Sequence, residues 1–397
     1  MISLAGRDIL HGWGKFLFTG LGLGLLIGVT LTMAGVYRGM LDDGRMQLDN
    51  SGADLWVVQK DTLGPYAEPS SLPDDSWRRL RTLPGVAQAA GITYLTMQVQ
   101  NGKRTVRTMV VGIAPYGPGT PGWPRHLVAG RHITRGHYEA VADLGTGFRI
   151  GDRVRLRRHE YTVVGLSRRT VSSNGDPMLF IPLSDAQQAQ FLKDNDAILE
   201  QRRRIAANPV LGRPTVVDAA IESQTSPHSV NAVLLRLAPG ARSEEIVQTI
   251  GRWQRFTAYD RDAMGDILIG KLIATASRQI GMFLVILAFV SAAIVAFIIY
   301  TMTMDKIREI AVLKLIGTRN RTIAGMILQQ ALALGLIGFV VGRISAGLAT
   351  PLFPKFVLLI PLDSFIGFFA VMAICTVASL ASIRLALRVD PAEAIGG

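Results

Sequence analysis

The sequence predicts a membrane protein of two parts: an all-α membrane part of four transmembrane helices, and an extracytoplasmic mixed α+β domain of two lobes. Three observations indicate this class. The 397 residues are 49% hydrophobic and 18% charged, too apolar for an ordinary soluble protein and too polar for one that lies wholly in lipid. Four uncharged apolar runs have the roughly 20 residues needed to cross a bilayer. A long polar segment with strand and helix patterns separates the first run from the second.

The four runs divide the chain into nine segments. We expect the transmembrane helices at 16–37, 281–304, 322–342 and 364–383. The remaining segments are a cytoplasmic or interfacial N-terminal segment (1–15), the extracytoplasmic, or periplasmic, domain (38–280), a loop (305–321), a short outer loop (343–363) and a tail (384–397). A cleaved signal peptide is the alternative interpretation of the first run, because Thr32-Met33-Ala34 resembles a cleavage site. The run is longer than a typical signal-peptide core, which favours a transmembrane helix.

The orientation follows from the Lys and Arg residues in the short loops. The loop 305–321 is strongly basic, with Lys306, Arg308, Lys314, Arg319 and Arg321. The loop 343–363 carries only Arg343 and Lys355. Because short cytoplasmic loops are enriched in Lys and Arg, we expect 305–321 to be cytoplasmic. With four crossings, both termini are then cytoplasmic and 38–280 lies outside a bacterial inner membrane.

Glycines recur at intervals of four in two of the predicted membrane helices. They are Gly20, Gly24 and Gly28 in the first helix, and Gly338 and Gly342 in the third. A stripe without side chains allows another helix to approach closely, which predicts a packing surface. The alternative is that glycine is simply frequent in membrane helices. The spacing leaves open whether the contact lies within one chain or between two.

The outer segment contains alternating strand and helix patterns. We expect strands at 53–58, 91–100, 104–113, 154–156, 161–166 and 230–237, and helices at 74–83, 184–206 and 243–253. The last helix begins with Ser243, a residue type that favours the N-cap. A turn at Arg158-His159-Glu160 is expected to join two of the strands. One lobe would use both ends of the segment, and the other its middle, from about 105 to 225.

Several patterns resemble reactive or binding sites without meeting their requirements. Residues 265–272 nearly match a phosphate-binding loop, but Leu272 stands where the Ser or Thr that holds Mg²⁺ is needed. His126, His132 and His137 have no metal-ligand spacing. The single Cys375 allows no intrachain disulfide. The net charge of +12 is not gathered on one element, so a solvated basic surface is favoured over a nucleic-acid site. We therefore predict no catalytic, cofactor or metal residues.

A short amphipathic helix is expected within the loop 305–321. Ile307, Ile310, Ala311 and Lys314 follow helical spacing, and Gly317 is a natural helix stop. Two interpretations remain open. The helix either lies on the lipid surface or docks into a groove of a cytoplasmic partner.

Several motifs resemble a known family. The run KIREIAVLKLIGTRNRTI (306–323) and the ending VDPAEAI (389–395) are similar to signatures of the FtsX/MacB-type permeases of ABC transporters. ADLWVVQ (53–59), LGTGFRIGDRVRL (144–156), EYTVVGL (160–166) and DPMLFIPLSDAQ (176–187) resemble the periplasmic domain of that family. The start LAGRDILHGWGKFLFT (4–19) is similar to the DevC-like branch, in which no ATPase domain is fused to the permease.

The resemblance implies a function and a set of partners. The chain would be a non-catalytic permease subunit that acts with a second permease copy, in a homodimer or heterodimer, and with a separate ABC ATPase that binds ATP and Mg²⁺. The loop would couple the two through Lys306, Arg308, Glu309, Ile310, Leu313, Lys314 and Gly317. ATP-driven closure of the ATPase would move the outer domain, for export with a periplasmic adaptor.

Two other functions remain as alternatives. One is an FtsX-like or lipoprotein-releasing subunit that transmits force to a periplasmic enzyme or lipoprotein. The other is a membrane-anchored enzyme or scaffold, which would have no use for a coupling loop.

Overall fold

The computed structural model of the chain describes residues 13–388, except 115, 116, 118, 192–202, 205, 206, 208–228 and 354. Most of the predicted N-terminal segment, the tail motif at 389–395 and most of the helix expected at 184–206 lie outside the described residues. The chain forms two compact units. One comprises Met1–Met40 and Ala276–Gly397, and the other comprises Leu41–Thr275.

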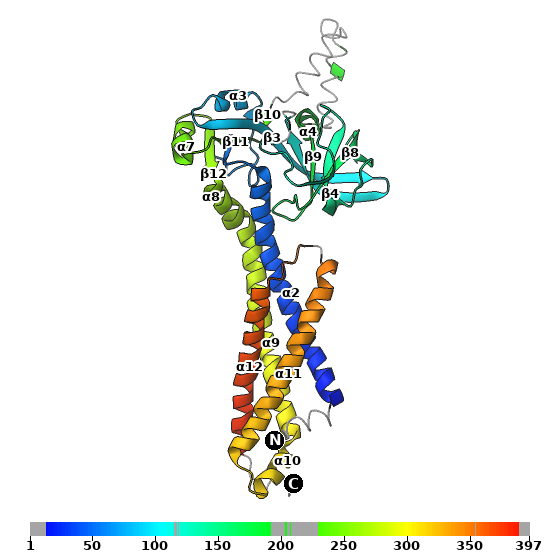
Figure 1. Cartoon of the computed structure of the whole chain (residues 1–397), viewed down its shortest axis with the longest axis vertical. Coiled ribbons are helices and arrows are strands. Elements are labelled where there is room, and N and C mark those ends of the chain that lie inside the picture. The colour runs from blue at the N-terminus through cyan, green and yellow to red at the C-terminus, as the bar shows by residue number, and fades with distance from the viewer. Residues whose placement is uncertain are drawn as a thin grey trace. The chain divides into compact units, whose positions relative to one another are not determined.

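The first unit is a helical bundle (Figure 1). Its elements are α2 (Trp13–Ser51, up to Met40), α9 (Ala274–Asp305, from Ala276), α10 (Ile307–Leu315), α11 (Asn320–Ala349), η3 (Thr350–Leu352) and α12 (Pro361–Arg388). Four helical stretches are long and apolar enough to cross a membrane: Leu17–Ser51, Arg261–Asp305, Asn320–Ala349 and Pro361–Arg388. The predicted runs 281–304, 322–342 and 364–383 each lie within one of them, and the run 16–37 begins one residue before the first. The fold class predicted for this part, an all-α membrane unit of four helices, is confirmed.

The interior of the bundle is formed by small and branched apolar side chains. Leu23, Ile27, Leu334, Cys375 and Ala378 belong to one buried cluster. Large side chains of α9 instead remain exposed, including Phe283, Phe289 and Phe297. Because lipid is as apolar as these side chains, a membrane helix gains nothing by hiding them from it. The bundle thus has a thin packed interior and broad apolar outer faces.

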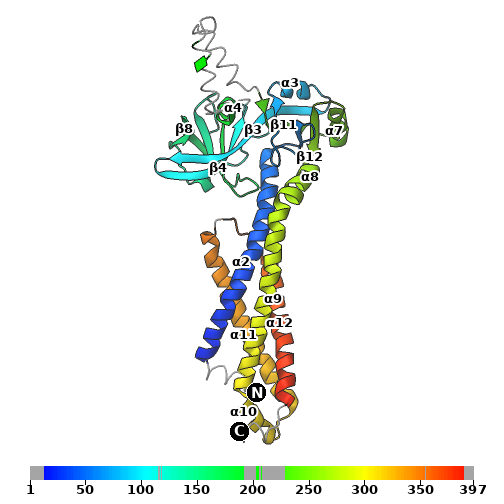
Figure 2. The same ribbon diagram turned by 180° about the vertical axis from the view of Figure 1, so that it is seen from behind.

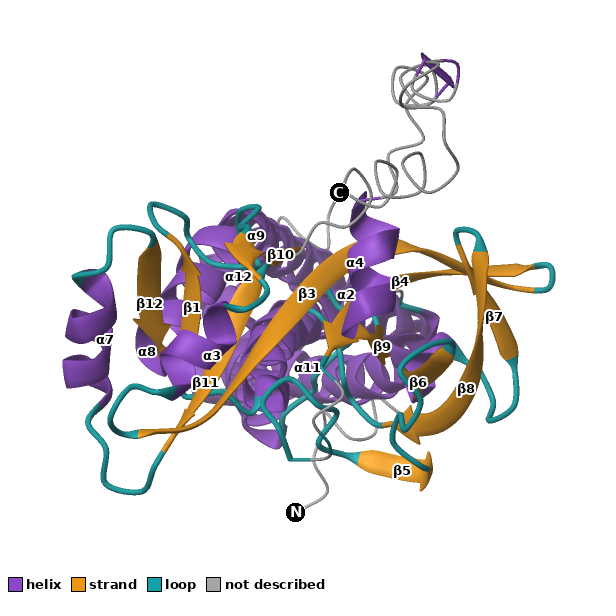
Figure 3. Cartoon of the chain, turned by 90° about the horizontal axis from the view of Figure 1, so that it is seen from above, coloured by secondary structure: helices purple, strands orange, loops and turns teal. Residues whose placement is uncertain are grey.

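The second unit is built on one long sheet, which Figure 3 shows. Its strands are β1 (Leu55–Gln59), β3 (Val86–Asn101), β4 (Arg104–Ile113), β5 (Leu127–Gly130), β6 (Glu139–Asp143), β7 (Arg153–Leu156), β8 (His159–Ser167), β9 (Met178–Pro182), β11 (Ala232–Leu237) and β12 (Phe256–Asp260). The order is β12-β1-β11-β3-β4-β9-β6-β8-β5, and β7 pairs with β3 and β8. The pairs β4–β9 and β6–β8 are parallel, and the others are antiparallel.

Short elements complete this unit. They are β2 (Leu72–Pro73), which pairs with β10 (Ser229–Val230), and the helices α3 (Ser76–Arg81), η1 (Leu144–Thr146), α4 (Leu183–Phe191), α7 (Ser243–Gly251), α8 (Arg261–Gly265) and η2 (Asp266–Ile273). The last 11 residues of α2, from Leu41 to Ser51, also belong here. Figure 2 shows the hairpin of β3 and β4 from the opposite side.

The predicted mixed α+β domain of two lobes is confirmed. Each lobe has a buried cluster of its own, and a third cluster, which includes Trp56 and Phe180, joins the two lobes. One core uses both ends of the segment, with Leu55, Val57, Val233, Ile246 and Ile250 among its buried residues. The other uses the middle of the segment, from Val99 to Ala189. The predicted boundary near residue 105 is wrong, because β3 is a single strand of 16 residues that serves both lobes. A continuous strand passes through both cores, so no change in sequence pattern marks the division.

Three local expectations are corrected by the structure. Ser243 is the first residue of α7, and Arg242 occupies the N-cap without a side-chain bond. The turn between β7 and β8 is formed by Arg157 and Arg158, and His159 and Glu160 already belong to β8. Arg157 has a φ of 52°, a conformation uncommon for Arg, so the residue types gave no signal for this turn. The strand expected at 230–237 is divided between β10 and β11.

Candidate coupling helix and helix-packing seam

The helix α10 is delimited by two clear signals. It follows α9 after Lys306, which occupies its N-cap. At its other end, Gly317 has a φ of 88°, and its N–H donates to the carbonyl of Lys314 (3.0 Å) while that of Thr318 donates to the carbonyl of Leu313 (3.0 Å). This pair of bonds is a Schellman motif, which requires a left-handed residue where glycine is least strained. The predicted helix stop at Gly317 is confirmed.

One face of α10 is packed into the bundle. Ile310 is only 2% exposed and lies in a cluster with Ile323 and Ile327 of α11 and Ile383 of α12. The Nζ of Lys314 donates to the carbonyl of Leu387 at 2.7 Å. The side chain of Ile310 therefore holds α10 against the chain's own helices, and its predicted part in ATPase coupling stays a prediction. The hydrogen bond from Lys314 to Leu387 likewise holds α10 against α12.

The opposite face of α10 is apolar and open. Val312 is exposed, and Leu315 and Ile316 are 64% and 76% exposed. Arg308 and Glu309 are exposed beside them, and Lys306 and Leu313 are half-buried. We call Val312, Leu315 and Ile316 the docking face. Sequence reasoning missed these three residues because α10 has apolar residues on two sides, and periodicity does not tell which side is buried.

The predicted packing glycines come together within one chain. A Cβ on Gly24 would lie 2.5 Å from Val341 and 3.0 Å from the carbonyl of Gly338, both on α11. On α11, a Cβ on Gly342 would lie 2.8 Å from the carbonyl of Gly24. The absence of side chains thus lets the two backbones approach. We call this contact between α2 and α11 the glycine seam; its members are Gly20, Gly24, Gly28, Gly338 and Gly342.

The end of α2 within the second unit forms hydrogen bonds and ion pairs with other parts of the sheet domain. The buried Gln47 accepts a hydrogen bond from the N–H of Ser173 at 2.6 Å, and Asn50 donates to the carbonyl of Arg169 at 2.8 Å. The guanidinium of Arg169 forms an ion pair with Asp42. On the same stretch of helix, Asp49 forms an ion pair with Arg261 at the start of α8. We call these contacts the α2 joint. Sequence reasoning did not foresee it, because its partners are 119 to 212 residues apart in the chain (169 − 50 = 119; 261 − 49 = 212).

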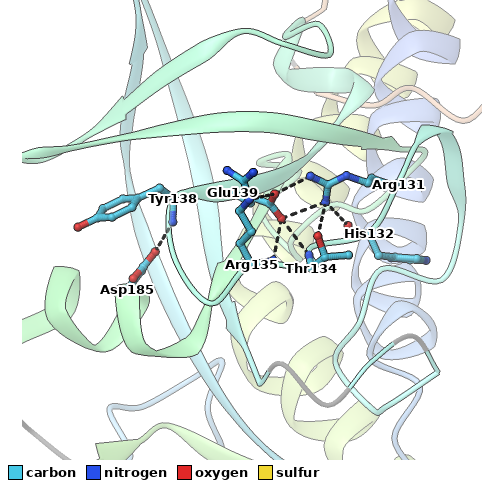
Figure 4. A network of polar contacts seen from close by, with 7 residues as sticks. All are labelled: Arg131, His132, Thr134, Arg135, Tyr138, Glu139 and Asp185. Carbon is cyan, nitrogen blue, oxygen red and sulfur yellow. Dashed lines mark hydrogen bonds and ion pairs between the residues drawn. The ribbon is translucent and has the colours of Figure 1, made fainter.

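A second polar network holds the loop before β6 (Figure 4). The carboxylate of Glu139, 3% exposed, accepts bonds from both terminal nitrogens of Arg131 (3.0 and 2.5 Å) and from the N–H groups of Thr134 and Arg135. These contacts, led by the bond from Arg131, lower the pKa of Glu139 from 4.5 to about 2, against the opposing effect of burial. Asp185 accepts a bond from the N–H of Tyr138 (2.9 Å). These bonds hold the loop before β6 in place.

The histidines and the phosphate-loop-like run singled out in the sequence have structural surroundings that explain them. His132 packs edge-on against Trp123, with ring centroids 5.5 Å apart, and His137 lies 2.5 Å from the carboxylate of Asp185. His126 is exposed. In the described parts of the chain, no three His, Cys, Asp or Glu side chains gather in a way that could hold a metal. Residues 265–272 are helical, divided between α8 and η2, and not a loop that could wrap a phosphate.

Two protein families match the chain. The MacB-like periplasmic core domain family matches residues 16–253, and the FtsX-like permease C-terminal family matches residues 281–391. An uncharacterised ABC transporter permease of Mycobacterium tuberculosis is 26% identical over 399 residues, which cover 100% of both chains. A similarly described permease of Mycobacterium bovis is 26% identical over 401 residues, again covering 100% of both.

Two solved structures are similar to parts of the chain. The periplasmic region of MacB from Actinobacillus actinomycetemcomitans is 10% identical, covers 55% of this chain and 95% of its own, and superposes with a TM-score of 0.35. The extracellular domain of the noncanonic ABC-type transporter YknZ from Gram-positive bacteria is 11% identical, covers 52% of this chain and 99% of its own, and gives a TM-score of 0.33.

Proposed function

Because the chain belongs to the FtsX/MacB-type family of ABC transporter permeases, we propose that it couples ATP hydrolysis by a separate cytoplasmic ATPase to movement of its own outer domain. The chain itself is then non-catalytic, and ATP and Mg²⁺ bind to the ATPase. Both termini lie in the cytoplasm, and residues 38–280 lie in the periplasm. The basic loop 305–321 supports this orientation.

The docking face of α10 is the observation that carries the proposal. Leu315 and Ile316 form an apolar centre, and Arg308 and Glu309 are exposed beside it. An apolar centre with a polar rim is the usual composition of a protein interface. The opposite face, through Ile310, is packed on α11 and α12. A displacement of α10 by a partner on the docking face would therefore reach α11 and α12. Close-packed interiors are nearly incompressible, so the contact would transmit the displacement.

The outer domain would receive the movement through α2. This helix continues without interruption from Trp13 to Ser51, and its last turns carry the α2 joint. Gln47 and Asn50 bond the loop of Ser173 and Arg169 directly. A displacement of α2 along its axis would thus move the sheet domain with it. The uncharged stretches of the four membrane helices support a mechanical role, since a substrate path through lipid usually carries ionisable residues.

The assembly would contain a second permease copy, as a homodimer or heterodimer, and a periplasmic adaptor protein for export. The second candidate is an FtsX-like or lipoprotein-releasing subunit that acts on a periplasmic enzyme or lipoprotein. The same docking face and α2 joint serve either function. The proteins that copurify on the periplasmic side distinguish them: an adaptor favours export, and an enzyme or lipoprotein favours the alternative.

Copurification of the full chain from mild detergent tests the coupling. We expect the wild type to bring down an ABC ATPase, identified by mass spectrometry, together with ATP turnover in the eluate. Leu315→Asp places a charge in the docking face, and burying an unpaired charge costs several kcal/mol. At about 1.4 kcal/mol per tenfold in affinity, ATPase recovery should fall about a hundredfold or more.

The matched control is Val128→Asp, which adds the same charge at an exposed apolar residue of the outer domain and should retain the ATPase. Full ATPase recovery by Leu315→Asp, or a wild type that recovers none, contradicts the proposal. Ile310→Asp is unsuitable for this test, because Ile310 is buried and its loss would also loosen α10.

A further inference from the structure

The long strand β3 has one edge that its neighbours cover only in part. Along one edge, β4 pairs with β3 from Ile92 to Asn101. Along the other edge, β11 pairs only as far as Ile92, and β7 pairs only at Gln100. Figure 3 shows β11 and β7 toward opposite ends of β3. No strand in the described part of the chain pairs with this edge between Leu95 and Val99. We call this stretch the β3 gap.

The hydrogen-bond pattern of the hairpin fixes which backbone groups point into the β3 gap. β3 and β4 are joined by the two-residue turn Gly102-Lys103, so Asn101 and Arg104 form a pair that exchanges both hydrogen bonds. Bonded pairs then alternate along the ladder, and the N–H and C=O of Thr96 and Gln98 face away from β4, toward the gap. The next such group, the N–H of Tyr94, is already bonded to Asn231 at 2.9 Å.

The β3 gap opens into a groove of about 420 Å³. Its lining consists of the β3 residues 95–98 and Gln100, together with Arg155 and Arg157 of the neighbouring hairpin. Five residues of strand span roughly 17 Å at about 3.3 Å each. The groove therefore has the backbone donors and acceptors, and the length, to receive one short extended segment. An uncovered sheet edge is the usual template for such strand addition.

The positive charge around the β3 gap favours an acidic partner. Arg155 borders the groove, and further exposed cations lie on the two adjacent hairpins: Lys103, Arg104 and Arg153. Two carboxylates lie nearby. Asp152 is occupied by bonds from Asn101 (2.8 Å) and from the N–H of Arg149 (2.9 Å), and Glu160 lies across from Arg155 on β8, so cations still outnumber carboxylates around the gap. An acidic strand would be attracted to this surface. A second copy of the same edge would set arginines against arginines, which destabilises strand pairing.

We propose that the β3 gap binds an extended acidic segment of a partner protein by β-strand addition, with Arg155 pairing one of its carboxylates. This inference does not rest on ATPase coupling, because the groove lies entirely within the outer domain. Its failure would leave the proposed function intact, and the reverse also holds.

The test measures peptide binding to the full chain in detergent micelles without nucleotide, by fluorescence anisotropy. The probe is a labelled peptide, Thr-Glu-Val-Glu-Val-Glu-Thr. Two comparison peptides are its Lys-for-Glu version and a version N-methylated at alternate residues, which keeps the charge but removes the edge hydrogen bonds. We expect saturable binding of the acidic peptide only, at concentrations up to about 1 mM. N-methylation should weaken it at least about tenfold.

Two variants and a control test the residues. Gln98→Pro removes an N–H that points into the gap, at an edge position where proline is tolerated, and should weaken binding at least about tenfold. Arg155→Glu, which reverses a charge that lines the groove, should abolish it. Arg252→Glu, an exposed arginine in the other lobe, should bind like the wild type. Circular dichroism checks that each variant is folded.

Three results would overturn the proposal. They are no binding of the acidic peptide, equal binding of the N-methylated peptide, which would make the contact purely electrostatic, and self-association of the chain that Gln98→Pro abolishes, which would assign the edge to a second copy.

Discussion

Ile310 and Leu315 lie five positions apart on one short helix and have opposite surroundings. Ile310 is buried among isoleucines of α11 and α12, whereas Leu315 is 64% exposed. Both are equally apolar, so residue type alone assigns them the same place. Ile310 holds the helix in place, and we propose that Leu315 contacts a partner; the difference comes from which side of α10 faces the bundle.

Gly24 provides a sharp test of the glycine seam at the scale of one residue. Gly24→Leu would place a Cβ 2.5 Å from Val341 and 3.0 Å from a backbone carbonyl. Overpacking of this kind costs about 1–3 kcal/mol, so the variant should melt earlier and elute less uniformly from size exclusion in detergent. The matched control is Gly22→Leu on the same helix, where a Cβ would meet no heavy atom within 4 Å. Equal behaviour of the two variants would mean that the seam contributes nothing to stability.

Glu139 should make the stability of the outer domain sensitive to acid. Its pKa is lowered from 4.5 to about 2, first by the hydrogen bond from Arg131. A lowered folded-state pKa stabilises the fold fully above the unfolded value near 4.5, and this contribution is lost as the pH falls toward 2. Glu139→Gln should therefore lower the free energy of unfolding by about 1–3 kcal/mol at pH 7, and the difference from wild type should shrink between pH 4.5 and 2.

The measurement is denaturant unfolding of the full chain in detergent, followed by tryptophan fluorescence, since Trp123 packs against His132 beside this loop. Glu160→Gln, at an exposed carboxylate, serves as the control and should change little at any pH. A Glu139→Gln deficit that is as large at about pH 2 as at neutral pH would contradict the assigned ionisation.

At the scale of one element, α10 depends on how it ends. Gly317 adopts a φ of 88°, and a β-branched residue in that conformation is strained, so Gly317→Val should cost about 1 kcal/mol or more. We expect faster tryptic cleavage within the loop 305–321 and reduced ATP turnover of the copurified complex. Gly317→Asn should be milder, because Asn tolerates the left-handed region.

Gly325→Val is the matched control for Gly317. Gly325 lies within α11, and a Cβ there would meet no heavy atom within 4 Å. If Gly317→Val is cleaved no faster than Gly325→Val, the Schellman motif does not determine the position of the helix end.

The predicted and observed bounds agree for some elements and differ for others. The strand β4, Arg104–Ile113, lies where its alternation indicated, because a half-buried antiparallel strand repeats every two residues. β3 extends five residues before the predicted start, to Val86. α2 continues to Ser51, well past its apolar run. In both cases the extra residues are held by distant partners, and tertiary contacts of this kind override local preference.

For the whole molecule, the orientation in the membrane is the prediction most directly open to experiment. In a Cys375→Ala background, which removes the one buried thiol, Lys103→Cys should react with an impermeant maleimide added to intact spheroplasts. Ile316→Cys, which is highly exposed on α10, should react only after the membrane is opened. Labelling of Ile316→Cys from outside would reverse the proposed topology.

The membrane part followed from the sequence because its physical requirement is local. Lipid offers no hydrogen bonds to the backbone, so an uncharged run of about 20 residues has little choice but to form a spanning helix. The glycines at Gly24 and Gly342 were likewise visible as a stripe. Only the structure paired them within one chain, because spacing along a helix says nothing about which helix lies opposite.

The sequence by itself determined that four helices cross a membrane, that a two-lobed mixed domain follows the first, and that a short helix joins the second to the third. Each of these rests on composition or on a period of two or 3.6 residues, which neighbours in the chain enforce. The tertiary structure decided that Ile310 is an anchor, that Gln47 holds Ser173, and that no strand of the described residues pairs with the second edge of β3 between Leu95 and Val99. These depend on residues brought together from distant parts of the chain, and only packing of the whole fold selects among the many partners that polar and apolar side chains would accept.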